Sequence, residues 1–242
     1  MKYCLWHGEE YGEECLGCLY DQQEQPFEDV LKDLHAIADK TLTREVTMKT
    51  QDQLDREWFE RTIAIDTQAG ASYDQVTAEI QAISDWYDKT PSIINEQTVT
   101  MYHCFSNECH DQAKWLTKKH NVKIELVTGQ PYLTLEEMSA DIRQGILKIT
   151  TDNTNHPIMF LEDTIALRIW HDLTHYEIQA NFGFYGEVRT YEAQCLHVET
   201  SWRNQVYLQH VLYCDIVGQV ANGLVHRVFP EQKVFTLYSR SN

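Results

Sequence analysis

Apolar residues recur at helical spacing in the C-terminal half of the chain, from Phe160 to about Val225. The clearest segment, residues 161–175, has two distinct faces. Its apolar face carries Leu161, Ile165, Ile169 and Leu173, and its polar face carries Thr164, Arg168, His171 and His175. Because every third or fourth residue of a helix lies on the same side, this spacing predicts one amphipathic helix.

The N-terminal half shows the same spacing in shorter segments. Pro26 and the apolar positions from Phe27 to Ile37 predict a first helix, and the polar residues 43–52 predict a linker. The pattern also predicts helices at Gln53–Ala64, Tyr73–Tyr87, Asn107–His120 and Leu135–Ile146, and strands at Val99–Phe105, Val122–Val127 and Leu147–Thr150. A weaker strand pattern covers Val234–Leu237.

Strands and helices that alternate over short distances are typical of a small parallel sheet with right-handed crossovers. We therefore expect an α+β fold that is predominantly helical, with a small βαβ-type sheet packed with a C-terminal helical bundle. Three parts are expected along the chain: a zinc knuckle or ribbon at 1–22, a helix and linker at 23–52, and a main α+β domain at 53–242. A chain of 242 residues can bury a sizeable core.

The N-terminal part contains two C-x-x-[CH] pairs, Cys4 with His7 and Cys15 with Cys18. Thiolates and imidazoles are the ligands of tetrahedral structural Zn²⁺ sites. Four such ligands leave no coordination position open for a substrate. The spacing therefore predicts a structural zinc ion.

Composition limits the expected partners and location. The formal net charge of −17 disfavours nonspecific nucleic-acid binding, which depends on basic patches. No apolar run reaches transmembrane length, and the start lacks the basic-then-apolar order of a signal peptide. The seven cysteines are an odd number, which fits reduced thiols better than a disulfide framework. We expect a cytoplasmic protein without a membrane partner.

The polar stripe of residues 161–175 contains the chemistry. His171 and His175 lie one helical turn apart and can hold one metal ion from one side, as in H-E-x-x-H metalloenzymes. Asp172 stands where those enzymes have Glu, and we expect it to act as a base or a further ligand. Arg168, one turn earlier, is expected to clamp a substrate anion, or to orient a ligand by pairing with Asp172 or Glu187.

A catalytic zinc site needs a third protein ligand, and the downstream candidates are Glu187, Glu192, His197 and Glu199. We favour Glu187, because Gly186 places it at a helix start, where the chain can turn it toward the histidines. The alternatives without a catalytic metal are a solvated helix face and a structural pair of buried histidines.

A second metal arrangement starts from the adjacent His171 and Asp172, as in HD-type phosphohydrolases. His156 or His120, together with Asp215, would complete that set. Neighbouring side chains on a helix point about 100° apart, so the doublet could share a site only at its edge.

Another group of metal-ligand residue types flanks the turn predicted at Ser106. It comprises His103, Cys104, Cys109 and His110. The two pairs need not converge, and a cysteine in an apolar segment usually behaves as a small hydrophobic residue. We expect no metal there.

The motifs of the C-terminal half occur in a characteristic order. They are His156-Pro157, Leu167-Arg168-x-x-His171-Asp172-x-x-His175, Phe182-Gly183-x-x-Gly186-Glu187, Glu199-Thr200 with Gln205, and Glu231-Gln232-Lys233-Val234. This order resembles an uncharacterised family encoded by phages and mobile elements, whose members often form one module of large multidomain polyvalent proteins. The resemblance covers roughly residues 70–240 and implies a phage-type intracellular protein, without an established reaction.

The family pattern is F-R-x-x-H-D-x-x-G-H, followed by F-G-x-x-G-E, a His and an E-T-R-G-Q-like segment. This sequence departs from it at two places. His175 comes one residue earlier than the family histidine, and Ser201-Trp202-Arg203 follows the Glu-Thr pair. These departures affect which residues of this chain correspond to the second histidine and to the arginine of the family pattern.

Two function classes follow. In the first, the protein is a phage-encoded intracellular hydrolase with Zn²⁺ or Mn²⁺ at His171, His175 and Glu187, acting on a small-molecule, phosphoester or peptide substrate. In the second, it is a non-enzymatic acidic phage protein that binds and inhibits a host protein and holds only the structural zinc. Metal content separates the two classes.

Overall fold

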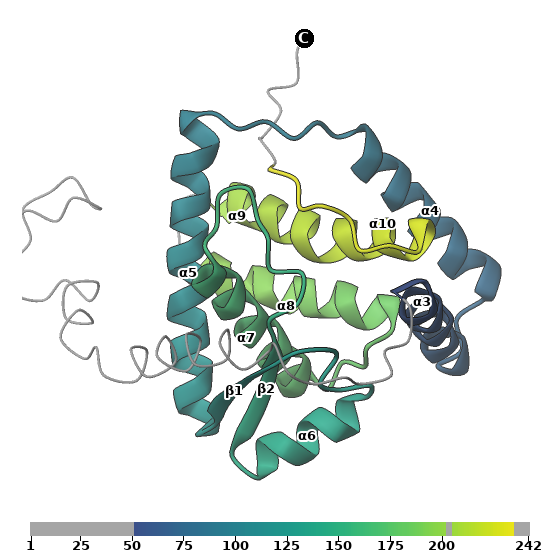
Figure 1. Ribbon diagram of the computed structural model, residues 1–242, viewed down its shortest axis with the longest axis horizontal. Helices are drawn as coiled ribbons and strands as arrows, with labels where there is room; N and C mark the ends of the chain where they lie inside the picture. Colours follow the sequence, from purple (N-terminus) through teal and green to yellow (C-terminus); the bar gives the residue numbers. More distant parts are fainter. Residues whose placement is uncertain (1–50, 202–204, 235–242) are drawn as a thin grey trace, which may run out of the picture. The chain divides into compact units, whose positions relative to one another are not determined.

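Helices form most of the chain in the computed structural model, which describes residues 51–201 and 205–234 (Figure 1). These residues belong to one unit of the chain, Thr47–Asn242. The predicted zinc knuckle, the predicted helix after Pro26 and nearly all of the predicted linker lie outside the described residues. The weak strand predicted at Val234–Leu237 also lies outside them, except for Val234, which has no strand structure.

The elements follow in a simple order along the chain. They are α3 Gln51–Gln68, α4 Tyr73–Lys89, α5 Glu96–His120, β1 Lys123–Val127, α6 Leu135–Arg143, β2 Ile146–Thr150, α7 Leu161–Ile178, α8 Phe184–Ser201, α9 Gln205–Leu212, the π-helix η2 Tyr213–Gly218, and α10 Gln219–His226. The prediction of a predominantly helical chain with a small parallel sheet is confirmed. None of the helices in the described ranges is both long and apolar enough to cross a membrane.

The strand predicted at Val99–Phe105 is wrong, because these residues belong to the long helix α5. Asn95 begins this helix: its side chain accepts from the N–H of Thr98, whose hydroxyl accepts from the N–H of Asn95, at 2.9 Å each. This reciprocal capping satisfies two backbone donors that an uncapped helix leaves unpaired. The buried Tyr102 and Cys109 then continue at helical spacing through the predicted turn at Ser106. A short apolar run alone does not distinguish a strand from a helix.

The sheet therefore has two strands instead of three. β1 and β2 pair in parallel, from Lys123 opposite Ile146 to Val127 opposite Thr150, with α6 as the crossover. Helix α6 ends at Arg143, earlier than predicted. Gly145 adopts a φ of +81°, a left-handed conformation that glycine tolerates and that prepares the turn into β2.

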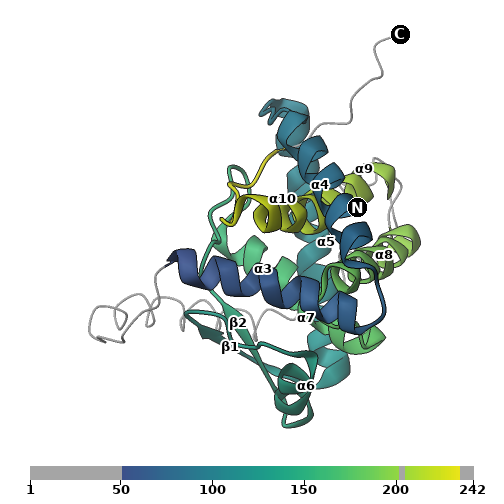
Figure 2. The same ribbon diagram turned by 90° about the vertical axis from the view of Figure 1, so that its right-hand side faces the viewer.

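Helix α7 lies at the centre of the described part and packs most extensively against α5, with α8 on another side (Figure 1). Three residues of its predicted apolar face, Ile165, Ile169 and Leu173, are at most 3% exposed, whereas Leu161 in the first turn is 38% exposed. The turned view shows α10 beside α4 (Figure 2). The core thus holds α7 rigidly and fixes the direction of its polar stripe.

Candidate metal centre

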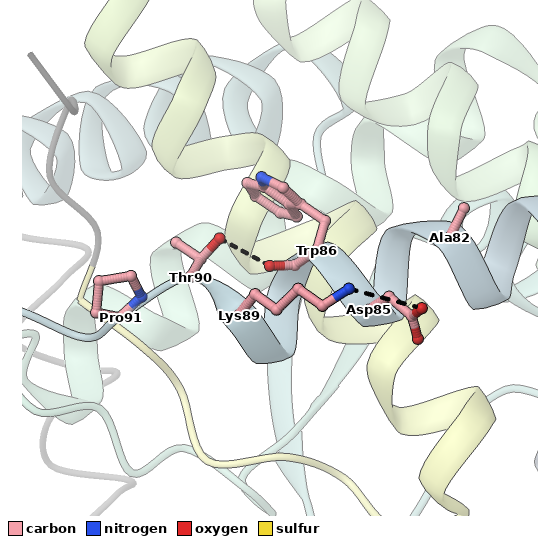
Figure 3. A pocket seen from close by; sticks show the side chains of 6 residues that line it. All are labelled: Ala82, Asp85, Trp86, Lys89, Thr90 and Pro91. Carbon is pink, nitrogen blue, oxygen red and sulfur yellow. Dashed lines mark hydrogen bonds and ion pairs between the residues drawn. The ribbon is translucent and has the colours of Figure 1, made fainter. Parts of the chain in front are cut away.

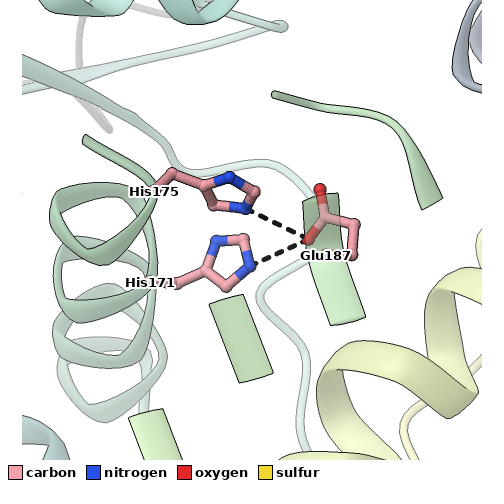
Figure 4. A group of neighbouring side chains, drawn as sticks. All are labelled: His171, His175 and Glu187. Carbon is pink, nitrogen blue, oxygen red and sulfur yellow. Dashed lines mark hydrogen bonds and ion pairs between the residues drawn. The ribbon is translucent and has the colours of Figure 1, made fainter. Parts of the chain in front are cut away.

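Two histidines of α7 and one glutamate of α8 point toward one another (Figure 4). The Nε2 atoms of His171 and His175 both face a single oxygen, Oε2 of Glu187, at 2.9 Å and 3.3 Å. The three ligand atoms lie within 4.8 Å of one another. We call these three residues the His-His-Glu triad. Among the side chains that the structure describes, this is the group of three or more metal-ligand residues that comes close enough to hold one ion.

The opposite nitrogen of each imidazole already has a partner. Nδ1 of His175 lies 3.1 Å from the carbonyl oxygen of Ala180, and Nδ1 of His171 lies 3.2 Å from Oδ1 of Asp172. Since a carbonyl oxygen only accepts, Nδ1 of His175 must carry the hydrogen, and the carboxylate favours the same tautomer in His171. Both Nε2 lone pairs are then available to a metal ion.

Burial and charge distinguish the triad from an ordinary surface cluster. His175 is fully buried, and the side chains of Glu187 and His171 are 14% and 21% exposed. Burial lowers the pKa of His171, but the carboxylates of Glu187 and Asp172 raise it to about 10. Burial raises the pKa of Glu187, whereas the two imidazoles hold it well below its usual range. Without a metal ion, a proton on His171 thus balances the charge of Glu187.

Glycines allow Glu187 to reach the histidines. A Cβ on Gly186 would overlap the backbone oxygen of Asn181, and a Cβ on Gly183 would overlap the Asp66 carboxylate. Asn181 also accepts a hydrogen bond from the N–H of Gly183 at 3.1 Å. The two glycines of the F-G-x-x-G-E motif are therefore explained by close packing at the start of α8, where a side chain would overlap Asp66 or Asn181.

Asp66 of α3 contributes to the same helix start. It is 2% exposed, and its carboxylate accepts from the backbone N–H of Tyr185 at 3.3 Å, with a further hydrogen bond from Phe184. Burial raises the pKa of Asp66, these N–H groups lower it, and the charge of Glu187 raises it. Sequence reasoning missed Asp66, since it lies 119 residues from Tyr185 and no local pattern links them.

Arg168 lies outside the triad. Its Nη1 donates to the carbonyl oxygen of Thr150 at 2.6 Å, and its Nη2 donates to that of Asn153 at 3.0 Å. Burial lowers the pKa of Arg168, while Asp172 and Asp152 raise it. The guanidinium therefore ties α7 to the end of β2, and the expected ion pair with Glu187 does not form.

The other candidates for a third ligand are placed elsewhere. Glu192 is exposed on α8, and His197 accepts a hydrogen bond from Nε1 of Trp170 at 3.1 Å. The side chain of Glu199 lies outside the described residues. Among the described side chains, the structure thus brings Glu187 to the histidines.

The HD-type set is not brought together. Nε2 of His120 lies 2.7 Å from Glu177, and Nδ1 of His156 accepts from the N–H groups of Ile158 and Met159. Burial lowers the pKa of His156 to about 4. The carboxyl group of Asp215 is buried in the π-helix η2, and burial raises its pKa. None of the three residues joins His171 in a metal-binding group.

The second cluster, His103, Cys104, Cys109 and His110, lies within helix α5. It does not form a metal-binding group among the described residues. Cys109 is fully buried in the core. Nε2 of His110 lies 2.8 Å from Oδ1 of Asp163, whose other oxygen accepts from the N–H of Phe160 at the start of α7. His110 thus supports a helix cap.

A surface pocket lies at the end of α4, and no triad residue lines it (Figure 3). Its lining residues are Ala82, Asp85, Trp86, Lys89, Thr90 and Pro91. The charged groups of the lining pair with each other, Lys89 with Asp85 at 3.9 Å, and the Thr90 hydroxyl donates to the Trp86 carbonyl oxygen at 2.8 Å. The pocket offers no group of metal ligands.

Comparison with known proteins gives no further assignment. No protein-family model, curated protein or solved structure matches the chain.

Proposed function

We propose that His171, His175 and Glu187 bind one divalent metal ion, Zn²⁺ or Mn²⁺, and that the protein is a metal-dependent hydrolase. One observation carries the proposal. A single carboxylate oxygen faces two Nε2 atoms whose partner nitrogens are already hydrogen-bonded. A metal ion between these atoms would replace the proton on His171 that balances the charge of Glu187 in the metal-free triad.

Two imidazoles and one carboxylate are a ligand set of catalytic zinc sites, which keep a fourth position for water or substrate. A bound divalent ion supplies a hydroxide at neutral pH and polarises a carbonyl or phosphoryl oxygen. The partial exposure of His171 and Glu187 leaves a route from solvent. Asp172 orients His171, and Arg168 holds α7 in place, so both serve as positioning residues in this proposal.

The N-terminal residues Cys4, His7, Cys15 and Cys18 are proposed to hold a separate structural zinc ion, on the strength of their spacing. The resemblance to phage and mobile-element proteins supports an intracellular role in an infected cell. The proposed structural zinc ion is independent of the triad.

Metal analysis tests the proposal directly. We expect wild type to bind one more equivalent of metal than His171→Ala, and one more than the double variant Cys15→Ser, Cys18→Ser. His226→Ala is a matched control, because His226 lies 2.9 Å from Asp88, the same distance as His171 from Glu187, without a second histidine. Equal metal content in wild type and His171→Ala would overturn the metal site.

Activity is tested on the same proteins with Zn²⁺ or Mn²⁺ added, against phosphoesters, nucleotides and peptides. Turnover that is lost in His171→Ala and kept in His226→Ala supports the hydrolase. If the protein instead binds and inhibits a host factor, the metal-loaded protein should turn over no substrate. In that case His171→Ala would keep the effect of the wild-type protein on infected cells.

A further inference from the structure

The surroundings of the triad favour a particular class of substrate. Phosphoesters bring one or two negative charges, and proteins bind such groups with Arg or Lys side chains or with the N-terminus of a helix. Both kinds of anion-binding element occur beside the triad, Arg168 on α7 and the start of α8. The question is whether either can accept a substrate anion.

The guanidinium of Arg168 is already used by the protein. It donates to two backbone carbonyl oxygens, of Thr150 at 2.6 Å and of Asn153 at 3.0 Å, and it is partly buried. Turning it toward a substrate would break both hydrogen bonds, including the one to the partly buried carbonyl group of Thr150.

The start of α8 is occupied as well. The Asp66 carboxylate accepts from the N–H of Tyr185 at 3.3 Å and from Phe184, where an anionic substrate group would bind. Asp66 is 2% exposed, and a Cβ on Gly183 would overlap its carboxylate, so the carboxylate is tightly enclosed. A protein carboxylate thus holds the position that a phosphate would need.

The remaining charge around the triad is negative. Glu187, Asp172 and Asp66 carry three carboxylates, against the one guanidinium of Arg168 that interacts with Asp172. The whole chain carries a formal net charge of −17. Such a field repels anions and attracts neutral or cationic groups.

On the basis of the proposed metal site, we propose that the substrate is a neutral or cationic amide or peptide, and not a phosphoester. The bond that is hydrolysed is the amide bond. In the reaction, the oxygen of one water forms a bond to the carbonyl carbon and the C–N bond breaks. One hydrogen of the water passes to the nitrogen of the leaving amine. The other stays on the new carboxylic acid, which ionises and releases it to the amine or to solvent. The balance needs no oxidant, reductant or second substrate.

The first experiment measures ligand binding on the full chain loaded with Co²⁺, whose visible spectrum reports changes at its coordination sphere. N-acetylglycinamide serves as the neutral amide probe and inorganic phosphate as the anionic probe. We expect N-acetylglycinamide to change the spectrum at a concentration at least about tenfold lower than phosphate. Phosphate binding as tight as or tighter than N-acetylglycinamide binding would overturn the proposal.

The second experiment measures turnover by the Zn²⁺-loaded chain of a mixed fluorogenic peptide library and of p-nitrophenyl phosphate and bis(p-nitrophenyl) phosphate. We expect peptide cleavage that is lost in His171→Ala. Phosphoester turnover lost in His171→Ala would overturn the substrate class while supporting the hydrolase. If no substrate reacts although metal is bound, the hydrolase proposal fails, and the cobalt spectra still decide which ligand class the centre accepts.

Discussion

Two histidine–carboxylate pairs of this protein have the same length and different surroundings. Nε2 of His171 lies 2.9 Å from Glu187, and Nε2 of His226 lies 2.9 Å from Asp88. The side chains of the first pair are 21% and 14% exposed, and those of the second are 47% and 49% exposed. The first pair also has the Nε2 of His175 at the same oxygen, 3.3 Å away.

The difference shows which features besides proximity support the proposal of a metal site at the triad. In the exposed pair, water competes for both groups and screens their charges, so the interaction contributes at most about 1 kcal/mol. In the triad, lower exposure, a second imidazole and fixed tautomers combine to favour the proposed cation position between three ligand atoms. The following predictions test this contrast.

The largest effect is expected for Glu187→Gln. The substitution keeps the shape of the side chain and removes the charge that balances a metal ion. We expect the affinity for Zn²⁺ to fall by more than about 100-fold, because changes outside the ligand set already cost about 10–100-fold. The measurement is competition with a chromophoric chelator. Asp88→Asn is the control and should keep wild-type affinity; unchanged affinity in Glu187→Gln would remove Glu187 from the ligand set.

Gly186→Ala tests the backbone that carries Glu187. The added methyl group would overlap the backbone oxygen of Asn181, so we expect a loss of about 1–3 kcal/mol in unfolding free energy. Gly223→Ala, in the helix of His226, is the matched control. Its methyl group would lie 3.2 Å from the Trp58 ring, a side chain that can adjust, and we expect a smaller loss. Urea unfolding compares the two, and a larger loss for Gly223→Ala contradicts this explanation.

Asp172→Asn tests the orientation of His171. An amide at this position can accept a hydrogen bond from Nδ1 without supplying charge, so the imidazole becomes a weaker ligand. We expect a loss of about 10–100-fold in metal affinity with the fold intact, measured by chelator competition and circular dichroism. A loss as large as that of Glu187→Gln would instead indicate that Asp172 binds the metal itself.

The smallest effect is a pH dependence with opposite signs in the two pairs. In metal-free protein, burial acts against the charge on His171, but Glu187 and Asp172 raise its pKa to about 10. Its stabilising contribution is therefore complete below about pH 6.5 and is lost as the pH rises toward 10. The pKa of Asp88 is lowered by the hydrogen bond with His226, so its contribution is present above about pH 3.8 and is lost as the pH falls.

Urea unfolding in the presence of a chelator measures both contributions. The difference in unfolding free energy between wild type and His171→Ala should decrease from pH 6.5 to 10. The difference between wild type and Asp88→Asn should decrease on the acid side, from about pH 4 downward. A His171 contribution that grows with pH would show that the metal-free pair is not ionic.

The contrast between α7 and α5 shows how far the pattern predicts the fold. In α7, apolar residues that recur every four positions predict the element, and three of the four, all except Leu161, are buried. In α5, the residues Val99–Phe105 form a short apolar run that fits either a strand or a helix. Packing against α7 and the cap at Asn95 favour the helix, and the predicted three-stranded sheet is reduced to β1 and β2.

The sequence by itself determined that His171 and His175 share one face, because both belong to one helix and lie four residues apart. The glycine before Glu187 also indicated a turn toward them. Only the tertiary structure decided that Glu187 reaches the histidines, that Asp172 faces Nδ1, and that Arg168 is held by backbone carbonyl groups. Helical periodicity is local, whereas these contacts join separate elements whose packing fixes which side chains meet.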